Sequence, residues 1–333
     1  MKKRRLGYTD LHLTTIGQGT WAIGGDSWSH GWGPQDDSNS IQTIYKALDL
    51  GINWIDTAAA YGLGHAEEII RKALAGRPEE VIIATKCGIV WEDDGSGDIS
   101  FSLKSESVRS EVEASLRRLD VETIDLYQIH YPIPDEDLEE GWATVAELVK
   151  EGKVRYAGIS NNSLAQLKRI QKIHSVASIQ PEYSMLKREP EKELLAYCAE
   201  NGIGVVAYSP LRSGILTEQF SQERLDTLAE DDWRQRNPDF QEPQATINLV
   251  FVEKLRALAA GENLSPSAMA IAWVLARPEV TSAIVGARRP EQIEKSVPGS
   301  DNELPSQVMA EIDALLAERE ENLAEIETLT AAS

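Results

Sequence analysis

The stretch NWIDTAAAYG, Asn53 to Gly62, decides the fold that this sequence predicts. It continues an apolar run that starts at Ile52, and it places Asp56 where that run ends, five residues before Tyr61. A short apolar run of this kind is typical of a strand that is buried on both faces. An acid and a phenol would then share the rim at the carboxyl end of the strand.

Two later stretches have the same form. VIIATKCG ends its apolar run at Lys86, and IDLYQIHYP ends its run at His130. In a barrel of parallel strands the carboxyl ends converge on one face, where the loops that follow the strands build the active site. We therefore expect the acid, the phenol, the amine and the imidazole to meet on that face.

Strand and helix patterns alternate along the chain. Apolar runs predict eight strands, near residues 13–19, 52–58, 81–86, 124–130, 154–160, 177–182, 203–208 and 281–285. Amphipathic patterns predict helices between them, near residues 38–50, 64–75, 104–119, 138–151, 163–174 and 189–201. This order predicts an α/β fold, a closed (β/α)8 TIM barrel, as a single domain over residues 1–333.

Three segments depart from this alternation of strands and helices. Residues 3–14 predict a β-hairpin before the barrel, where it would plug the barrel floor. Residues 212–246, between strands seven and eight, form a long charged loop, and long loops in compact domains are usually functional or mobile. Extra C-terminal helices are expected near 247–261 and 267–276, from Pro290, and around 305–327.

Composition favours a globular protein without nucleic-acid or membrane partners. The chain has 333 residues, of which 42% are hydrophobic, which is ample for a packed core. Its 33 basic and 54 acidic residues give a formal net charge of −21, which repels nucleic acid and anionic membrane surfaces. No apolar stretch follows the basic start MKKRR, so we expect a soluble cytoplasmic protein.

Cysteine and histidine spacing predicts neither a disulfide nor a metal site. Cys87 and Cys198 lack a CxxC partner, and the five histidines form no HxH or HExxH spacing. Redox chemistry would then have to come from an organic cofactor. The sequence GQGTW, Gly17 to Trp21, lacks the third glycine of GxGxxG and opens no helix, so a Rossmann domain is not expected.

The four strand-end residues suit the reduction of a carbonyl group. A carbonyl that accepts a hydride also needs a proton, and a phenol with a pKa of about 10 is a poor donor near neutrality. A nearby ammonium lowers the pKa of a phenol, and a carboxylate keeps that ammonium charged. Tyr61, Lys86 and Asp56 supply these three groups. His130 can donate a hydrogen bond to the carbonyl oxygen.

The sequence resembles the aldo-keto reductases from Gly17 to Gln292. The motifs that carry the resemblance are DTAAAYG, ATKCG, QIHYP, GISNN, IQPEYS, YSPL and GARRPEQ, in this order. The resemblance implies reduction of an aldehyde or ketone, reversible as alcohol or polyol oxidation, with Tyr61 as the general acid. It implies NADP(H) as the cofactor, with NAD(H) as the alternative.

The resemblance also implies which residues hold the cofactor. Ser160, Asn161 and Gln180 would hydrogen-bond the carboxamide, and Tyr208 would stack on the nicotinamide ring. Each also suits a structural role, such as a helix N-cap. The other implied contacts are Gly19, Thr20, Trp21 and Asp56 beside the ring, and Ser209, Pro210, Leu211, Arg212, Ser213 and Gly214 around the pyrophosphate. Beyond what the resemblance implies, we expect cofactor contacts from Arg234, Gly286, Ala287, Arg288, Gln292 and Ser296, with Gln292 on the adenine side.

Arginines near the end of the resemblance favour NADP(H). Many family members carry a lysine, a serine and an arginine where this chain has Gly286, Ala287 and Gln292, so two usual basic contacts to the 2′-phosphate are missing. Arg288 follows at once, before a helix opened by Pro290. A guanidinium binds phosphate through two parallel hydrogen bonds. We therefore expect Arg288 to be the main contact of the 2′-phosphate.

Aromatic residues surround the expected substrate position. The candidates are Trp21, Trp28, Trp32, Trp91 and Tyr131, in or beside the loops after strands one, three and four. Aromatic walls suit an apolar body with one polar end, or the face of a sugar. The sequence indicates neither the individual substrate nor the oligomeric state.

Two other functions stay open at this point. Potassium-channel β subunits resemble the same family, so the chain could be a nicotinamide-binding regulatory subunit with little turnover. A barrel aldolase would use Lys86 to form a Schiff base, but it leaves Tyr61 and His130 unexplained.

Overall fold

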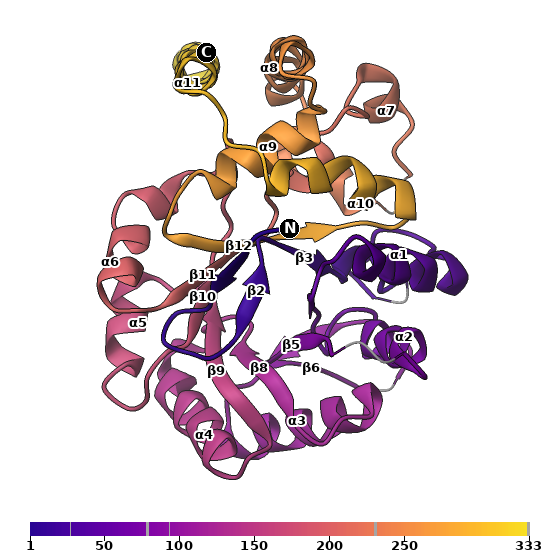
Figure 1. Ribbon diagram of the computed structural model, residues 1–333, viewed down its shortest axis with the longest axis vertical. Helices are drawn as coiled ribbons and strands as arrows, with labels where there is room; N and C mark the ends of the chain where they lie inside the picture. The colour runs from indigo at the N-terminus through magenta and orange to yellow at the C-terminus, as the bar shows by residue number, and fades with distance from the viewer. Residues whose placement is uncertain (27, 78–79, 93, 230–231, 332–333) are drawn as a thin grey trace.

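Eight parallel strands close into a barrel at the centre of the molecule (Figure 1). The structure is a computed structural model that describes residues 1–26, 28–77, 80–92, 94–229 and 232–331. Around the barrel the strands are β3 (Ile16–Gly19), β4 (Trp54–Asp56), β5 (Ile82–Cys87), β8 (Ile124–Ile129), β9 (Val154–Ser160), β10 (Ser178–Gln180), β11 (Gly204–Ala207) and β12 (Val280–Gly286). The predicted (β/α)8 barrel is confirmed.

Helices surround the barrel, as the amphipathic patterns predicted. They are α1 (Asp37–Asp49), α2 (His65–Leu74), α3 (Ser105–Leu119), α4 (Leu138–Lys150), α5 (Leu164–Ile170), α6 (Leu194–Glu200), α9 (Pro266–Leu275) and α10 (Pro290–Ser296). Polar residues fix the helix starts. Asp36 accepts a hydrogen bond from the N–H of Asn39 at the start of α1, and Ser163 forms a capping box with Gln166 at the start of α5.

The hairpin of β1 (Lys3–Arg5) and β2 (His12–Thr14) closes the floor of the barrel. Its Leu6, Leu11 and Leu13 are buried in a cluster with Trp54 and Val206 of the barrel interior. The floor plug predicted for residues 3–14 is therefore present. The structure divides the predicted first strand into two. Its first part, β2, pairs with β1 in the hairpin, whereas its second part, β3, pairs with β12 in the barrel.

The barrel interior is layered along the strands. Trp54, Ala84 and Leu126 lie in the apolar layer above the floor. Because side chains alternate along a strand, residues two positions further on face the interior again, one layer higher. The residues of that polar layer on β4, β5 and β8 are Asp56, Lys86 and Gln128.

Two segments hold structure that the sequence pattern did not indicate. A two-stranded hairpin of β6 (Ile89–Trp91) and β7 (Ile99–Phe101) follows β5. The long loop after β11 contains helix α7 (Gln222–Asp226) and the 3₁₀ turns η4 (Arg212–Gly214), η5 (Trp233–Arg236) and η6 (Pro238–Phe240). We call residues 212–229 and 232–246 the flap.

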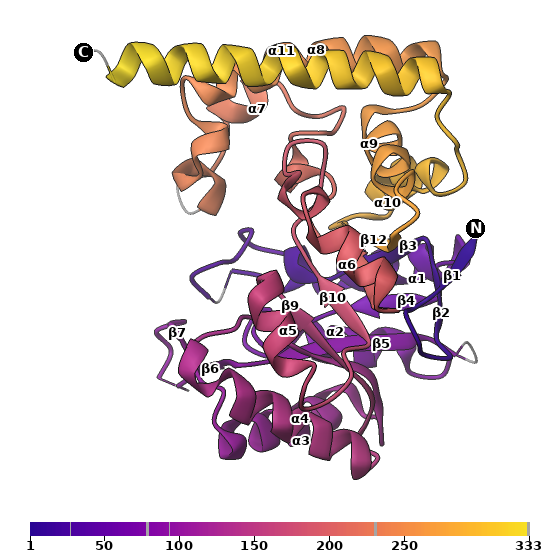
Figure 2. The same cartoon turned by 90° about the vertical axis from the view of Figure 1, so that its left-hand side faces the viewer.

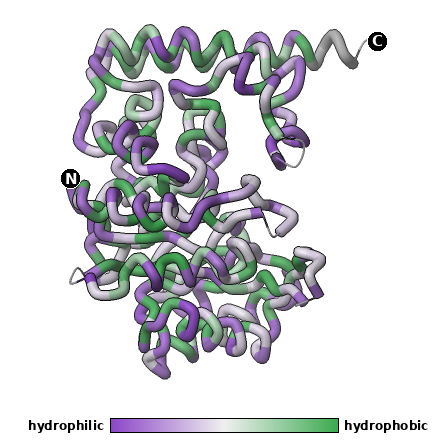
Figure 3. Tube along the Cα trace, turned by 90° about the vertical axis from the view of Figure 1, so that its right-hand side faces the viewer, coloured by the Kyte–Doolittle hydropathy of each residue, from purple (hydrophilic) through white to green (hydrophobic). Residues whose placement is uncertain are grey.

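The C-terminal helix α11 (Ser306–Ala331) lies alongside α8 (Gln244–Gly261), away from the barrel (Figure 2). Arg319 donates to the side chain of Asn248 at 2.8 Å, which ties the two helices together. Apolar and polar residues alternate along α11 (Figure 3), as expected for a helix with one packed face. Within the described part of the chain, no helix combines the length and apolarity needed to cross a membrane.

Candidate active site

Asp56, Lys86 and Tyr61 meet at the carboxyl end of the barrel. The ammonium nitrogen of Lys86 donates to Asp56 Oδ1 at 2.6 Å and to the backbone carbonyl of Thr57 at 2.8 Å. The same nitrogen lies 3.4 Å from the phenol oxygen of Tyr61. Lys86 is 1% exposed and Asp56 is 3% exposed, so the ion pair is shielded from water.

A tight turn after β4 aims the phenol of Tyr61. The N–H of Tyr61 donates to the carbonyl of Ala58 at 3.1 Å, and its carbonyl accepts from the N–H of Ala66 at 3.1 Å. Gly62 has a φ of +62°, and a Cβ atom there would lie 1.9 Å from the carbonyl oxygen of Gly24. Only glycine fits this approach, so the loop after β3 packs directly against the turn that carries the phenol.

Burial sets the protonation of these groups. Burial first, and then the Asp56 carboxylate, raise the pKa of Tyr61 well above its ordinary value. This net shift is opposite to the lowering that was expected from Lys86. Burial, and then the charge of Lys86, lower the pKa of His130 well below its ordinary value. At neutral pH the site therefore presents a phenol and an uncharged imidazole.

His130 stands beside Tyr61, just after β8. The backbone N–H of His130 donates to the carbonyl of Cys87 at 2.9 Å, which continues the pairing between β5 and β8. The rings of His130 and Tyr61 meet edge to face, with their centroids 5.7 Å apart. Both side chains line the same cavity, so one oxygen atom placed there is within the reach of both.

Two glutamines hold the other oxygen of the Asp56 carboxylate. Gln180 Nε2 donates to Asp56 Oδ2 at 2.8 Å, and Gln128 Nε2 lies 3.4 Å from the same oxygen. The resemblance implied that Gln180 bonds the carboxamide of the cofactor, and the structure adds this contact with Asp56. Gln128 was not predicted. Its position two residues before His130, on the same face of the strand, is the signal that could have found it.

Ser160, Asn161 and Tyr208 form one hydrogen-bonded chain along the cavity wall. Tyr208 donates its hydroxyl hydrogen to Asn161 Oδ1 at 2.8 Å, and Asn161 Nδ2 donates to Ser160 Oγ at 3.1 Å. Ser160 Oγ donates to the carbonyl of Gln180 at 3.0 Å. The structure thus brings the four residues expected at the nicotinamide together on one wall.

A cavity of about 850 Å³ opens above these residues. This volume lies in the range of cofactor and substrate sites. Of the residues predicted for the site, the cavity is lined by Gly19, Thr20, Trp21, Trp28, Trp32, Asp56, Tyr61, His130, Tyr131, Ser160, Asn161, Gln180, Tyr208, Ser209, Pro210, Leu211, Ser213, Gly214, Arg234, Gly286, Ala287, Arg288, Gln292 and Ser296.

Three predicted residues do not line the cavity. Lys86 lies beneath it, bonded to Asp56 and beside Tyr61. Trp91 stands on the β6–β7 hairpin, and its ring packs under the guanidinium of Arg118 at 5.8 Å, which corrects its assignment to the substrate pocket.

Arg212 is the third of these residues. Its guanidinium forms ion pairs with Glu182 and Asp239, so its charge is already paired by protein carboxylates.

The β6–β7 hairpin supplies part of the cavity wall that sequence patterns missed. Ile89, Ile99 and Phe101 line the cavity from this hairpin, and Asp98 lines it from the loop just before β7. The ring of Phe101 packs edge to face on Tyr131, with centroids 6.0 Å apart. This corner of the cavity is therefore apolar with one carboxylate at its edge.

Tryptophan rings join the flap to the loop after β3. Trp233 of the flap stacks on Trp21 with ring centroids 5.5 Å apart, and it meets Trp32 edge to face at 5.7 Å. Arg234, the next residue, lies over the ring of Trp32 at 4.9 Å. The flap and the β3–α1 loop thus touch across the mouth of the cavity.

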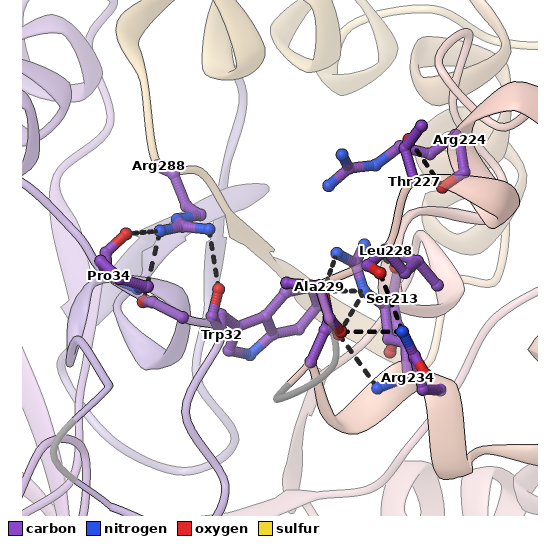
Figure 4. A network of polar contacts seen from close by, with 12 residues as sticks. Trp32, Pro34, Ser213, Arg224, Thr227, Leu228, Ala229, Arg234 and Arg288 are labelled. Carbon is purple, nitrogen blue, oxygen red and sulfur yellow. Dashed lines mark hydrogen bonds and ion pairs between the residues drawn. The ribbon is translucent and has the colours of Figure 1, made fainter.

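Arg288 ties the end of β12 to the β3–α1 loop (Figure 4). Its guanidinium donates to Gln35 Oε1 at 2.7 Å, to the carbonyl of Trp32 at 2.8 Å, and to the carbonyls of Gly33 and Pro34. These four acceptors occupy most of its five N–H groups. The structure therefore gives Arg288 a loop-holding role, which leaves few of its N–H groups for the phosphate contact that the sequence predicted.

No group of three or more histidine, cysteine or acidic side chains that could hold a metal ion is found among the described residues.

The chain belongs to the aldo/keto reductase family, whose pattern it matches over residues 15–317. It is 38% identical over 289 residues to the aldo-keto reductase YhdN of Bacillus subtilis (strain 168), covering 86% of this chain and 85% of the relative. It is 38% identical over 309 residues to the NADH-specific methylglyoxal reductase of Escherichia coli (strain K12), covering 89% and 93%.

Among solved structures, the glycerol dehydrogenase AKR11B4 of Gluconobacter oxydans superposes with a TM-score of 0.87 at 37% identity, covering 96% of both chains. The chain is therefore an oxidoreductase of the aldo-keto reductase family, with the (β/α)8 fold of its relatives.

Proposed function

We propose that the protein reduces small aldehydes or ketones, and oxidises the matching alcohols, with NADP(H) as cofactor and Tyr61 as the general acid. The observation that carries this proposal is the buried Lys86–Asp56 ion pair, 2.6 Å between charged atoms, directly behind a phenol that lines the cavity. A buried charge pair of this kind beside a cavity is typical of a functional site.

The residues divide the proton chemistry among them. A carbonyl oxygen near Tyr61 Oη and the His130 ring accepts hydrogen bonds from both, which polarises the carbonyl. As negative charge develops on that oxygen, the phenol transfers its proton. Lys86 Nζ, 3.4 Å from the phenol oxygen, then stabilises the phenolate that is left. Asp56 and the two glutamines hold the ammonium in position.

The cavity walls fit an extended nicotinamide dinucleotide. When bound, this cofactor supplies the hydride. Asn161 and Gln180 present amide groups that suit the carboxamide, and Tyr208 presents a ring for the nicotinamide. Ser213 and Gly214 of the flap would face the pyrophosphate, and Gln292 and Ser296 at α10 the adenosine. Three further predicted cofactor contacts line the same cavity: Gly286, Ala287 and Arg234.

We favour NADP(H) over NAD(H) because three arginines line the outer part of the cavity. Guanidinium groups are the preferred partners of phosphate. The relative from Escherichia coli is named NADH-specific, so the two cofactors have to be compared directly in the test.

The substrate class we propose is a small carbonyl compound with hydroxyl neighbours. Two relatives are named as a methylglyoxal reductase and a glycerol dehydrogenase. The inner cavity combines the rings of Trp21, Trp28 and Tyr131 with polar groups of Ser29 and Asp98. This mixture of aromatic walls and hydrogen-bonding groups suits a short hydroxylated chain.

The other functions that the sequence left open receive less support. An aldolase needs an amine that the substrate can reach, whereas Lys86 lies outside the cavity lining and is bonded to Asp56. A regulatory subunit with little turnover would need no such aligned proton donor, and turnover itself distinguishes it.

The test is a set of absorbance assays at 340 nm with methylglyoxal, glyceraldehyde and dihydroxyacetone, each with NADPH and with NADH. Glycerol with the oxidised cofactors tests the reverse direction. We expect cofactor oxidation with at least one of these carbonyls, and a higher kcat/KM for NADPH. Absence of turnover with bound cofactor would favour the regulatory function instead.

A further inference from the structure

Three arginines from three separate segments line the outer part of the cavity (Figure 4). Arg224 lies on α7, Arg234 on η5, and Arg288 just after β12. The chain as a whole carries a formal net charge of −21, so positive charge gathered at one place stands out from the surface around it. Such a gathering favours an anion at that place.

Two of these guanidinium groups already have partners. Arg234 forms a buried ion pair with Asp232, with Nε 3.0 Å from Oδ1, and its Nη1 donates to the carbonyl of Ser213 at 3.4 Å. Arg288 is held by Gln35 and by the carbonyls of the β3–α1 loop. Their positions are fixed by protein groups, and few of their donors are free for a ligand.

Arg224 differs from both. Its guanidinium has no hydrogen bond or ion pair with any side chain or carbonyl in the described ranges, and the residue is exposed although it lines the cavity. Its backbone is anchored, because its N–H donates the capping hydrogen bond to Ser221 Oγ at 3.2 Å. In Figure 4 the side chain extends from α7 into the open space on the side of Arg288.

The positive charges of these three arginines repel one another. Burial first, and then the charges of Arg234 and Arg224, lower the pKa of Arg288. Asp232 is the nearby carboxylate that counteracts them, and it is already paired with Arg234. An anion bound between Arg224 and Arg288 would relieve this repulsion and use the free donors of Arg224.

The geometry points to Arg224 as the residue that recognises the 2′-phosphate of NADPH, which rests on the cofactor of the proposed function. The pyrophosphate has its own expected contacts at Ser213 and Gly214, beside Arg234. In Figure 4 the side chain of Arg224 extends toward the side on which Arg288 lies. Gln292, which is expected at the adenosine, lines the same cavity. A 2′-phosphate carries close to two negative charges and three acceptor oxygens, which suits a guanidinium with free N–H groups.

The test compares cofactor dissociation constants, measured by quenching of tryptophan fluorescence, for the full chain and for Arg224→Ala. Arg236→Ala is the matched control, because it removes the same charge from the same flap at an exposed residue outside the cavity lining. Four ligands are compared: NADPH, NADH, 2′,5′-ADP and 5′-ADP. The last two probe the 2′-phosphate without any nicotinamide chemistry.

We expect Arg224→Ala to weaken NADPH and 2′,5′-ADP roughly tenfold or more, as for loss of a charged hydrogen bond. Its effect on NADH and 5′-ADP should stay within about twofold on the same grounds. Arg224→Lys should restore part of the loss, and Arg236→Ala should behave as the unmodified chain.

Equal weakening of NADPH and NADH would place Arg224 at the pyrophosphate and overturn the assignment. An unchanged NADPH constant, an equal loss in Arg236→Ala, or tighter binding of 5′-ADP than of 2′,5′-ADP by the unmodified chain would overturn it as well. None of these results depends on carbonyl turnover. Failure of the proposed reaction is seen separately, in the assays at 340 nm.

Discussion

Tyr61 is surrounded by groups that keep its proton in place. Its hydroxyl is buried beside the Asp56 carboxylate, and both influences raise its pKa well above the ordinary value. The phenol form is the one that a general acid needs for carbonyl reduction. The reverse reaction needs the phenolate as a base, and that form is scarce at neutral pH.

This difference predicts that kcat/KM depends on pH differently for carbonyl reduction and for alcohol oxidation. Between pH 6 and 9, kcat/KM for reduction should be nearly constant, because Tyr61 stays protonated and His130, whose pKa burial lowers, stays neutral. Alcohol oxidation should rise by about tenfold per pH unit over the same range, in proportion to the phenolate. Steady-state kinetics in both directions measure this. An oxidation rate that levels off near pH 7 would contradict the assigned pKa of Tyr61.

Some residues of the candidate site could be predicted from the sequence, and others could not. Asp56, Tyr61 and His130 could be predicted because each follows an apolar run at a strand end, where the barrel geometry gathers side chains. The contacts of Arg288 and the position of Arg224 at the cavity could not be predicted, because they depend on where the flap and the β3–α1 loop pack against each other. The local periodicity of a sequence does not indicate how two distant loops pack against each other.

At the scale of elements, Glu111 joins α3 to the end of β5. Its carboxylate accepts the N–H of Gly88 at 2.8 Å and the hydroxyl of Ser107 at 3.1 Å. Gly88 begins the turn into the β6–β7 hairpin, which lines the cavity. Burial raises the pKa of Glu111 to about 7, while the hydrogen bond from Gly88 opposes that shift.

The raised pKa of Glu111 predicts that the free energy of unfolding falls as the pH rises. The folded state holds the proton up to about pH 7, whereas the unfolded chain releases it near 4.5, so the stabilisation is complete below pH 4.5 and disappears as the pH passes through 7. Relative to Glu111→Gln, the free energy of unfolding should fall by about 3 kcal/mol between pH 5 and pH 8. Urea unfolding of both proteins measures this. Parallel pH profiles would show that Glu111 does not carry the effect.

The tryptophan contact between flap and loop predicts slow release of the cofactor. Aromatic pairs contribute about 0.5–1.5 kcal/mol each beyond their buried area, and Trp233 makes two of them, with Trp21 and Trp32. Trp233→Ala should therefore speed cofactor dissociation about tenfold or more in stopped-flow fluorescence. Trp233→Phe, which keeps a ring, is the control. An unchanged dissociation rate in Trp233→Ala would show that the flap does not restrain the cofactor.

Most strands could be predicted from the sequence, with exceptions in the first strand and in the β6–β7 hairpin. Seven of the eight barrel strands lie within about two residues of their apolar runs, since both faces of a parallel barrel are buried. The first run is divided at Thr15, because β2 is taken up by the floor hairpin. The β6–β7 hairpin escaped prediction, since its strands are only three residues long and one side faces a cavity rather than water.

At the scale of the whole molecule, the formal charge of −21 opposes the folded state through self-repulsion. Added salt should therefore raise the thermal midpoint at pH 7 between low and about 0.5 M NaCl, because the Debye length shrinks to a few ångströms. The control is the same titration near the isoelectric pH of about 4.7, where the net charge vanishes. A midpoint that falls with salt at pH 7 would show that the surface ion pairs outweigh the repulsion.

We propose that Tyr61 gives the proton and that other groups bind the cofactor. The most direct test is the single-turnover rate of cofactor oxidation by Tyr61→Phe, with the cofactor dissociation constant measured on the same sample. Tyr61→Phe keeps the ring that packs against His130 and removes only the hydroxyl beside Lys86. We expect the rate to fall by about a hundredfold or more, with cofactor binding unchanged. A single-turnover rate close to that of the unmodified protein would contradict the account.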